Sequence, residues 1–281
     1  MGFHFKLIGY PITHSLSPWI HEQFLERSNL QGTYKIDEFK PEDSFEENIK
    51  RLKNEQIDGF NVTVPYKQAI IPFLDILDDT ARKMGAVNTV AYKNGKWIGY
   101  NTDGVGYVRS LESKYPNLFN NKENRVLVIG AGGAARAIYY ALDQYEFSNI
   151  DIANRTKATA EGIIEMAHSP RRTEILSLEE AEKNAGSYEL IIQTTSVGMK
   201  PNQEQAIISS NNIKLNTIVS DIVYQPVLTK FLRDSAKKGA MIHQGHTMLL
   251  YQGQYAFEIW TNKKINIGDM DTKLKDILEG R

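Results

Sequence analysis

Short apolar runs alternate with helical patterns along the whole chain, and this alternation limits the fold more than any other feature of the sequence. Such an order is typical of parallel strands joined by crossover helices. We therefore predict the α/β class, with two open α/β domains that are each built on a mostly parallel sheet.

In the first part of the chain, Asn94-Gly95 lies between two β-like runs and is a type I′ turn signal, so these runs should form a hairpin. The polar stretch Pro116–Asn124 predicts a linker. Expected strands are Phe5–Gly9, Thr33–Phe39, Gly59–Val64, Val87–Lys93 and Lys96–Tyr100, and expected helices are Pro18–Ser28, Phe45–Lys53, Lys67–Leu77 and Gly104–Tyr115.

The second part begins with a buried strand, because Arg125–Gly130 contains four consecutive apolar residues. The stretch His168–Lys183 is expected to be variable surface. Further strands are predicted at Ile150–Asn154, near Ile175, and at Leu190–Thr194, Thr217–Asp221 and Ala240–His243, with helices from the glycine-rich turn to about Gln144 and at Lys157–Ala167, Thr247–Trp260 and Asp271–Glu279.

The composition excludes several classes of protein. The 33 Lys and Arg residues nearly balance the 34 Asp and Glu residues, so the chain offers no basic field for nucleic acid or anionic lipid. The absence of cysteine excludes disulfides and thiolate chemistry and fits a reducing compartment. No signal peptide or membrane-spanning stretch is evident, so we expect a cytoplasmic protein whose partner is a small molecule.

A glycine-rich turn, Gly130-Ala131-Gly132-Gly133-Ala134-Ala135, joins the buried strand to a helix. The first glycine suits a tight turn, the second lets a pyrophosphate approach the backbone, and the small Ala135 suits close contact between helix and strand. The turn alone could be merely structural, but a second strand ends about 20 residues later, as dinucleotide sites require. We predict a Rossmann-like domain.

The end of that second strand indicates which cofactor binds. An NAD site has Asp or Glu there, whereas this chain has Asn154-Arg155-Thr156-Lys157. A guanidinium can hold a 2′-phosphate through paired hydrogen bonds. The other interpretation, a solvated helix start, is disfavoured because cations are not stabilised at that end of a helix. We predict NADP.

The loop after the first strand contains Ser15 and Ser17, followed by Pro18. Ser17 fits an N-cap with proline at the first helical position, so it has a structural explanation. Ser15 is not needed for capping. Two hydroxyls beside free helix amides could hold a carboxylate.

Further polar residues follow strands at edges where ligands bind in open α/β sheets. Thr63 and Lys67 follow the third strand, Asn88 begins a strand, and Asp103 begins a helix, where it could also be a cap. Gln252 lies on an apolar helical stripe and is either a core residue or a ligand donor. Tyr224 could simply pack.

These residues lie in motifs that, in this order, resemble those of the shikimate dehydrogenase family over nearly the whole chain. The motifs are His14–Pro18, Asn61–Lys67, Gly85–Thr89, Asn101–Gly104, Gly130–Ala134, Asn154–Thr156, Asp221–Tyr224 and Gly245–Gln252. The resemblance implies reversible NADPH-dependent reduction of 3-dehydroshikimate to shikimate, in aromatic amino-acid biosynthesis. It also implies a substrate-binding domain (1–104 and 245–281) and an NADP-binding domain (105–244), with the C-terminal helices returning to the first.

The resemblance further assigns roles to residues. Lys67 and Asp103 become the proton-transfer pair, although Lys67 acting alone remains open. The substrate-binding residues become Ser15, Ser17, Thr63, Asn88, Asp103, Tyr224 and Gln252. The cofactor-binding residues become Gly130, Ala131, Gly132, Gly133, Ala134, Asn154, Arg155, Thr156, Lys157, Ala158, Thr159, Ile222, Gly245 and Asp79.

Other interpretations remain at this stage. They are a quinate/shikimate dehydrogenase that uses NAD, a methylenetetrahydrofolate dehydrogenase, and an NADP-sensing module in which Lys67 and Asp103 are idle. No metal site is expected, since His243 and His246 have no third ligand at suitable spacing. The sequence does not distinguish a monomer from a homodimer.

Overall fold

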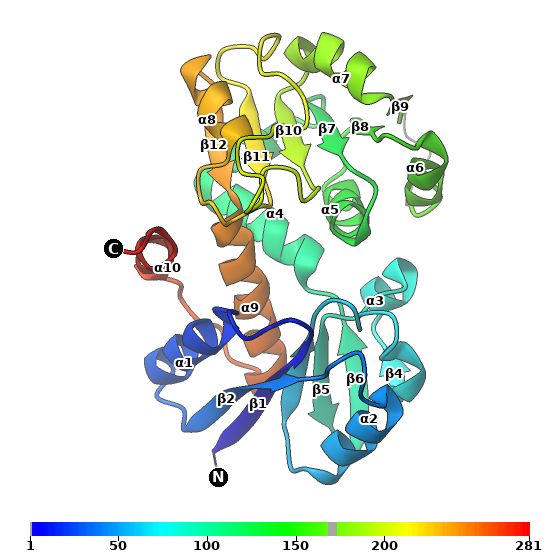
Figure 1. The fold of residues 1–281 in the computed structure, drawn as a ribbon, viewed down its shortest axis with the longest axis vertical. Helices are drawn as coiled ribbons and strands as arrows, with labels where there is room; N and C mark the ends of the chain where they lie inside the picture. The colour runs from blue at the N-terminus through cyan, green and yellow to red at the C-terminus, as the bar shows by residue number, and fades with distance from the viewer. Residues whose placement is uncertain (1, 168–172) are drawn as a thin grey trace. The chain divides into compact units, whose positions relative to one another are not determined.

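The computed structural model describes residues 2–167 and 173–281, and the chain folds as two compact units. The first unit comprises 1–102 and 252–267, and the second comprises 103–251 and 268–281. Each unit contains one six-stranded sheet. These are the two sheets that the alternation of the sequence predicts, each with its own helices (Figure 1).

The first sheet has the order β2-β1-β3-β5-β6-β4. Its first three strands pair in parallel, while β5 and β6 pair antiparallel as the expected hairpin. Positive φ angles at Asn94 (52°) and Gly95 (76°) fit the predicted I′ turn. The strands are β1 (Phe3–Gly9), β2 (Gly32–Glu38), β3 (Gly59–Val62), β4 (Ile76–Leu77), β5 (Thr89–Lys93) and β6 (Lys96–Tyr100).

Helices cover both faces of this sheet. On one face, α2 (Phe45–Asn54) buries Ile49 and Leu52 in a cluster with strand residues such as Ile8 and Phe60. On the other face, Phe5 of β1 contacts the rings of Phe257 and Trp260 in α9 (Gly245–Thr261). The helix α1 (Ser17–Arg27) packs there too, and α3 spans Asp79–Met84.

The second sheet is entirely parallel, with the order β12-β11-β10-β7-β8-β9. This order, with crossovers on both sides of β7, is the doubly wound arrangement of dinucleotide-binding domains. The strands are β7 (Arg125–Ile129), β8 (Asn149–Ala153), β9 (Ile175–Leu176), β10 (Leu190–Gln193), β11 (Ile218–Asp221) and β12 (Met241–Gln244).

Alternate residues of these strands enter two separate cores. Val126 and Val128 of β7 face the cluster that includes α4 and α5, whereas Leu127 and Ile129 face the cluster that includes α7 and α8. Burial on both faces explains the uninterrupted apolar runs in the sequence. The helices are α4 (Asp103–Lys114), α5 (Gly133–Asp143), α6 (Lys157–Ile164), α7 (Leu178–Asn184), α8 (Lys230–Lys237) and α10 (Met270–Glu279).

The expected helix Lys67–Leu77 is wrong. The chain forms turns there, then a 3-10 turn at Ile71–Phe73 and the short strand β4. Pro72 explains the difference, because it has no N–H to donate within an α-helix and its ring disfavours helical geometry at the residue before it. The helices α3, α7 and α8 were not expected; part of α7 lies in the stretch assigned to variable surface, of which 168–172 fall outside the described residues.

The expected linker Pro116–Asn124 is also wrong. Its first half is a 3-10 helix, Pro116–Asn120, whose Leu118 and Phe119 are buried in the core of the second unit. The units instead meet in sequence at Thr102 and Asp103. These two apolar residues lie among polar ones, so the polar composition of the stretch wrongly predicted an exposed linker.

The chain returns to the first unit only in part. Residues 252–267, which include most of α9, join it, whereas α10 groups with the second unit, contrary to the expectation for both C-terminal helices. α10 buries Met270 and Leu274, and its Asp271 lies 3.0 Å from Nε2 of the buried His246. These contacts bind α10 to the start of α9. The domain limits 1–104 with 245–281, and 105–244, stay a prediction.

Trp260 anchors α9 on the first sheet and gives a test of that packing. Its ring stacks on Phe5 at 4.4 Å, and its Nε1 donates a hydrogen bond of 2.9 Å to the Val90 carbonyl. Trp260→Phe should lower the free energy of unfolding by about 1–3 kcal/mol, because it removes buried area and leaves that carbonyl with one donor fewer. Denaturant titration measures the change, and Trp19→Phe in the partly exposed part of α1 should cost less than about 1 kcal/mol. Equal losses would contradict this anchoring role.

Candidate active site

The serine loop follows β1 in the first unit. The structure corrects the capping role expected for Ser17: α1 begins at Ser17 itself, and Leu16 occupies the N-cap position without a side-chain cap. The Oγ of Ser15 instead accepts a hydrogen bond of 3.2 Å from the Ser17 amide, although Ser15 was not expected to serve the helix start. Ser17 is buried, and its Oγ accepts a hydrogen bond of 3.2 Å from the Oγ of Ser15. Ser17 is therefore not the N-cap residue, and the two hydroxyls form a pair suited to a carboxylate.

Thr63 and Lys67 lie on the loop after β3. The Thr63 amide donates to Ile8 at 2.9 Å, and the Tyr10 amide donates to Val64 at 2.9 Å, so this loop runs beside the start of the serine loop. The carbonyl of Lys67 accepts from the Val87 amide at 2.8 Å, which holds Lys67 near the segment before Asn88. A loop rather than a helix therefore presents Lys67.

Asn88 and Gln252 are brought together in the first unit, as the resemblance implied. Asn88 is buried, its Oδ1 accepts from the Thr102 amide at 2.8 Å, and its Nδ2 lies 3.5 Å from Oε1 of Gln252. Thr102 immediately precedes Asp103 in the chain. Two amide side chains in contact can offer both donors and acceptors to vicinal hydroxyls.

Sequence reasoning missed two polar residues behind this cluster. Tyr34 of β2 donates a hydrogen bond of 2.8 Å to Asn61 Oδ1, and Asn61 Nδ2 donates to the Asn88 carbonyl at 3.1 Å. Asn61 lies inside a motif that was recognised. Its position in the strand β3, where a buried amide requires partners, was the available signal.

In the second unit, the glycine-rich turn has the geometry expected of a phosphate-binding turn. Gly130 has φ of 117°, and a Cβ there would lie 2.4 Å from Thr194 Oγ1, so only glycine fits. A Cβ on Gly132 or Gly133 would meet nothing within 4 Å, and no side chain caps α5. The helix start therefore combines uncapped amides with open space, which fits a pyrophosphate.

The segment Asn154–Thr159 follows β8 and lies on the surface. Arg155 is exposed and forms no ion pair with any other described residue. Lys157 is different, since its Nζ lies 3.1 Å from Glu180 of α7. Arg155 is therefore the better candidate to bind a 2′-phosphate, and Lys157 is engaged by a carboxylate.

Ile222, Tyr224 and Gly245 lie beyond the ends of β11 and β12. A Cβ on Gly245 would lie 2.3 Å from the Ile222 carbonyl oxygen, so the start of α9 packs directly on that backbone. Burial raises the pKa of Tyr224, which keeps its hydroxyl protonated and able to donate.

Asp221 was missed as a structural residue of this region. It is fully buried, and its carboxyl accepts from Thr229 Oγ1 (2.7 Å), the Val223 amide (2.9 Å) and Gln193 Nε2 (3.1 Å). Burial raises its pKa to about 6 despite these three donors. The carboxyl fixes the turn that carries Ile222 and Tyr224.

For Asp79, Lys67 and Asp103 the structure does not test the predicted roles. Asp79 is exposed at the start of α3, and its carboxylate pairs with Arg82 at 2.7 Å. Lys67 belongs to the first compact unit, and Asp103 is the first residue of the second. Their pairing, and the cofactor role of Asp79, stay predictions.

The histidines that the structure describes do not cluster as metal ligands. His243 is buried between Ser220 (2.9 Å to Nδ1), Ser110 and Thr247, and burial lowers its pKa to about 3, so the ring is neutral. Within residues 2–167 and 173–281, no three His, Asp or Glu side chains could hold a metal ion. None of the helices in this described part is long and apolar enough to cross a membrane.

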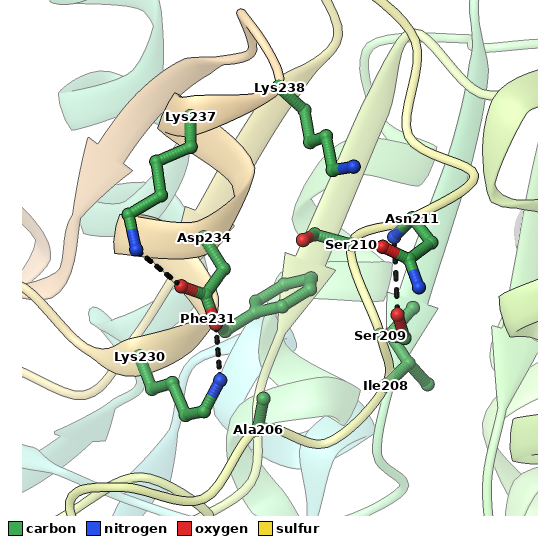
Figure 2. Close-up of a pocket in the computed structure, with 10 residues that line it drawn as sticks. All are labelled: Ala206, Ile208, Ser209, Ser210, Asn211, Lys230, Phe231, Asp234, Lys237 and Lys238. Atoms are coloured by element: carbon green, nitrogen blue, oxygen red, sulfur yellow. Dashed lines mark hydrogen bonds and ion pairs between the residues drawn. The ribbon is translucent and has the colours of Figure 1, made fainter.

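A hollow of about 480 Å³ lies between α8 and the segment 206–211 (Figure 2). Two of its lysines, Lys230 and Lys237, both pair with Asp234, so its charges largely satisfy each other. None of the predicted site residues lines this hollow.

Three family models match the chain. They describe a shikimate dehydrogenase substrate binding domain (residues 7–90), a shikimate/quinate 5-dehydrogenase (112–222) and a shikimate 5'-dehydrogenase C-terminal domain (245–275). The chain is 54% identical over 281 residues to shikimate dehydrogenase (NADP(+)) of Oceanobacillus iheyensis, with 100% of both chains covered.

Solved structures agree with these matches. The shikimate 5-dehydrogenase of Thermus thermophilus, in complex with NADP(H) and shikimate, is 29% identical, with 99% of both chains covered and a TM-score of 0.84. That of Listeria monocytogenes, in complex with shikimate and NAD, is 31% identical, with 99% of this chain and 96% of the other covered and a TM-score of 0.88.

The raised pKa of Asp221 predicts a pH-dependent stability. An unfolded aspartate titrates near 3.8, so the folded state holds this proton more tightly, and stability from it is present below about pH 4 and is lost as pH rises through about 6. The shift corresponds to about 3 kcal/mol. Asp221→Asn should abolish this loss, because an amide keeps one acceptor and can donate to Thr229.

Denaturant titrations at pH 4, 5, 6 and 7 measure this effect. The free energy of unfolding of Asp221→Asn minus that of wild type should increase by about 2–3 kcal/mol from pH 4 to pH 7, because only wild type loses stability over this range. The exposed Asp43→Asn is the control and should show no comparable trend. A difference that is constant with pH would rule out a titrating Asp221.

Proposed function

This chain belongs to the shikimate dehydrogenase family, and we propose that it catalyses the reversible NADPH-dependent reduction of 3-dehydroshikimate to shikimate in aromatic amino-acid biosynthesis. The observation that carries the proposal is that the first unit holds two polar pairs of the right chemistry. One is a pair of hydroxyls, Ser15 and Ser17, and the other is a pair of amides in contact, Asn88 and Gln252. A ring acid with vicinal hydroxyls presents the groups that these side chains complement.

In this proposal, Ser15, Ser17 and Thr63 hold the carboxylate, and Tyr224 is a further substrate-binding residue. Asn88 and Gln252 bind the ring hydroxyls. Asn88 is already held by Thr102, so its amide is oriented before substrate arrives. The functional domains are then 1–104 with 245–281 for substrate, and 105–244 for NADP.

The residues present fit NADP. The turn at Gly130 and the uncapped start of α5, Gly130 to Ala134, would hold the pyrophosphate, and Arg155 would hold the 2′-phosphate, with the rest of Asn154–Thr159 around it. Ile222 and Gly245 would lie against the nicotinamide, and Asp79 is a further cofactor-binding candidate. When bound, NADPH supplies a hydride to the ring carbonyl.

The chain itself supplies the proton. Reduction of a ketone leaves negative charge on oxygen, and Lys67 donates a proton to that oxygen, while oxidation of the alcohol uses Lys67 as the base. Asp103 orients Lys67 and accepts from the same hydroxyl. We propose that both residues work as a pair. The protein then acts on a small-molecule acid in the cytoplasm, as a monomer or homodimer.

A second candidate is a quinate or shikimate dehydrogenase that uses NAD, because a relative at 31% identity was solved with NAD. The exposed Arg155, and the lack of a carboxylate in Asn154–Thr159, favour NADP. The decisive assay follows nicotinamide absorbance with shikimate or quinate, and with NADP or NAD. We expect turnover of shikimate with NADP to dominate. Turnover of quinate with NAD at a similar kcat/KM would favour the second candidate.

Arg155→Asp should exchange the cofactor preference. The new carboxylate repels the 2′-phosphate and can accept hydrogen bonds from a ribose diol. We expect the Kd for NADPH to rise by at least about tenfold and the Kd for NADH to change much less. Fluorescence titration with both cofactors measures this. Lys157→Asp is the matched control, because Lys157 pairs with Glu180. This variant should change the ratio of the Kd values for NADPH and NADH less than Arg155→Asp does. Equal losses for both cofactors would exclude Arg155 as the reader of the phosphate.

Lys67→Ala should lower kcat by about 10²–10⁴-fold and leave the Kd of both ligands nearly unchanged. The missing interaction strengthens as the transition state forms, so the loss falls on kcat. Lys67→Arg should rescue little, because a guanidinium rarely gives up its proton. Steady-state kinetics with calorimetric binding measures both effects. If only KM rose, Lys67 would be a binding residue and Asp103 the better proton donor.

A further inference from the structure

Gln193 is a buried amide at the end of β10, the strand that lies between β7 and β11 in the second sheet. Only 1% of its surface is exposed. Its Nε2 donates to the Val197 carbonyl at 3.0 Å and to Asp221 Oδ1 at 3.1 Å, and its Oε1 accepts from the Thr195 amide. Both amide hydrogens and the oxygen are thus used within the second unit. The roles proposed above leave Gln193 without a task.

Two of these hydrogen bonds shape the loop 194–199, which follows β10. The Gln193 side chain joins the main chain of Thr195 to that of Val197, and the Val197 amide also donates to Thr195 Oγ1 at 3.2 Å. The loop therefore closes around the Gln193 amide, which supplies its interior hydrogen bonds.

The start of the same loop lies against the glycine-rich turn. The amide and the hydroxyl of Thr194 donate to the Ile129 carbonyl, at 2.9 and 2.7 Å, and Gly130 is the next residue after Ile129. A Cβ on Gly130 would lie 3.0 Å from Thr195 Cγ2 as well as 2.4 Å from Thr194 Oγ1. The loop that Gln193 shapes therefore borders the turn proposed to hold the pyrophosphate.

The remaining hydrogen bonds of Gln193 reach the turn after β11. Asp221 Oδ1, which accepts from the Gln193 side chain, also accepts from the Val223 amide at 2.9 Å. The main-chain carbonyl of Gln193 accepts from the Ile222 amide at 3.1 Å. The Ile222 carbonyl is in turn the surface on which Gly245 packs. Gln193 thus holds Ile222 both directly and through Asp221.

We propose that Gln193 is a positioning residue for the nicotinamide half of NADP. It fixes the loop 194–199 to the turn after β11, so that Ile222 is already in place beside the nicotinamide when the pyrophosphate lies at Gly130. The adenosine half depends instead on Arg155 after β8, and β7 separates β8 from β10. This inference rests on the proposed cofactor contacts of Gly130 and Ile222 and adds the residue that orders them.

The test is Gln193→Met, which keeps the length of the side chain and removes its hydrogen bonds. The Kd for NADP should rise about 5–20-fold, the scale of one or two lost hydrogen bonds. The Kd for adenosine 2′,5′-bisphosphate, a probe that carries the 2′-phosphate and lacks the nicotinamide, should stay within about twofold, because it reports on a separate part of the site. Calorimetric titration measures both. Equal losses for the two ligands, or an unchanged Kd for NADP, would overturn the proposal.

Two further variants separate positioning from folding. Gln193→Glu keeps an acceptor for the Thr195 amide, but when ionised it loses both donated hydrogen bonds and sets a second carboxylate beside Asp221. It should weaken NADP binding at least as much as Gln193→Met, and wild-type affinity in this variant would refute the role of the two donated bonds. Gln254→Met is the matched control, because Gln254 Nε2 donates to the Ile265 carbonyl at 2.6 Å in the first unit. It should lower stability without changing the Kd for NADP, and an equal loss of NADP affinity would mean that the effect of Gln193→Met is general destabilisation.

Binding measurements also keep this inference apart from the proposed activity. Wild type that binds NADP but does not turn over shikimate would refute the proposed activity and leave the test of Gln193 intact. An active wild type together with normal NADP binding by Gln193→Met would refute the inference alone.

Discussion

Burial on both faces is the constraint on which both sheets depend. In the second unit, alternate residues of β7 enter two different cores, and in the first unit β1 sends Ile8 to one core and Phe5 to the other. A strand that is covered on both sides has no face left for a ligand. Chemistry is therefore confined to the strand ends, and most candidate groups lie on a loop or helix start next to one, whereas Gln252 reaches Asn88 from the middle of α9.

Such confinement places polar residues close to the core, where each must be satisfied by a partner. In the first unit, amides and hydroxyls satisfy each other around Asn61 and Asn88. In the second, the buried carboxyl of Asp221 does so with three donors. Both groups sit directly behind residues proposed to touch ligand, so the same hydrogen bonds that satisfy the core also fix the site.

Much of the fold could be predicted from the sequence, because the spacing of apolar residues and the residues that form turns are local signals. The apolar runs, the Asn94-Gly95 turn and the glycine-rich turn each determine their own neighbourhood, and the structure confirms those elements. The helix expected at Lys67–Leu77 failed because Pro72 outweighed the apolar spacing. Ser17 as a cap failed for another reason: one residue of shift in a helix start changes a cap into the first helical residue.

Partners distant in the sequence were beyond such reasoning. Tyr34 reads as an ordinary strand residue until its hydroxyl is seen against Asn61, and Lys157 reads as a phosphate ligand until Glu180 is seen beside it. The family resemblance supplied candidate residues, while their hydrogen-bond partners came only from the fold. The pairing of Lys67 with Asp103 awaits the kinetic tests.

The discontinuous first unit has a consequence for synthesis on the ribosome. Its sheet is made from the first 102 residues, yet the aromatic face of that sheet is covered by Phe257 and Trp260 of α9. The portion that is translated first must therefore wait, with Phe5 uncovered, until almost the whole chain has emerged. The second unit, apart from α10, lies within one uninterrupted stretch and can assemble during that wait. The first unit therefore starts to be made before the second but cannot be completed until residues 252–267 have been made.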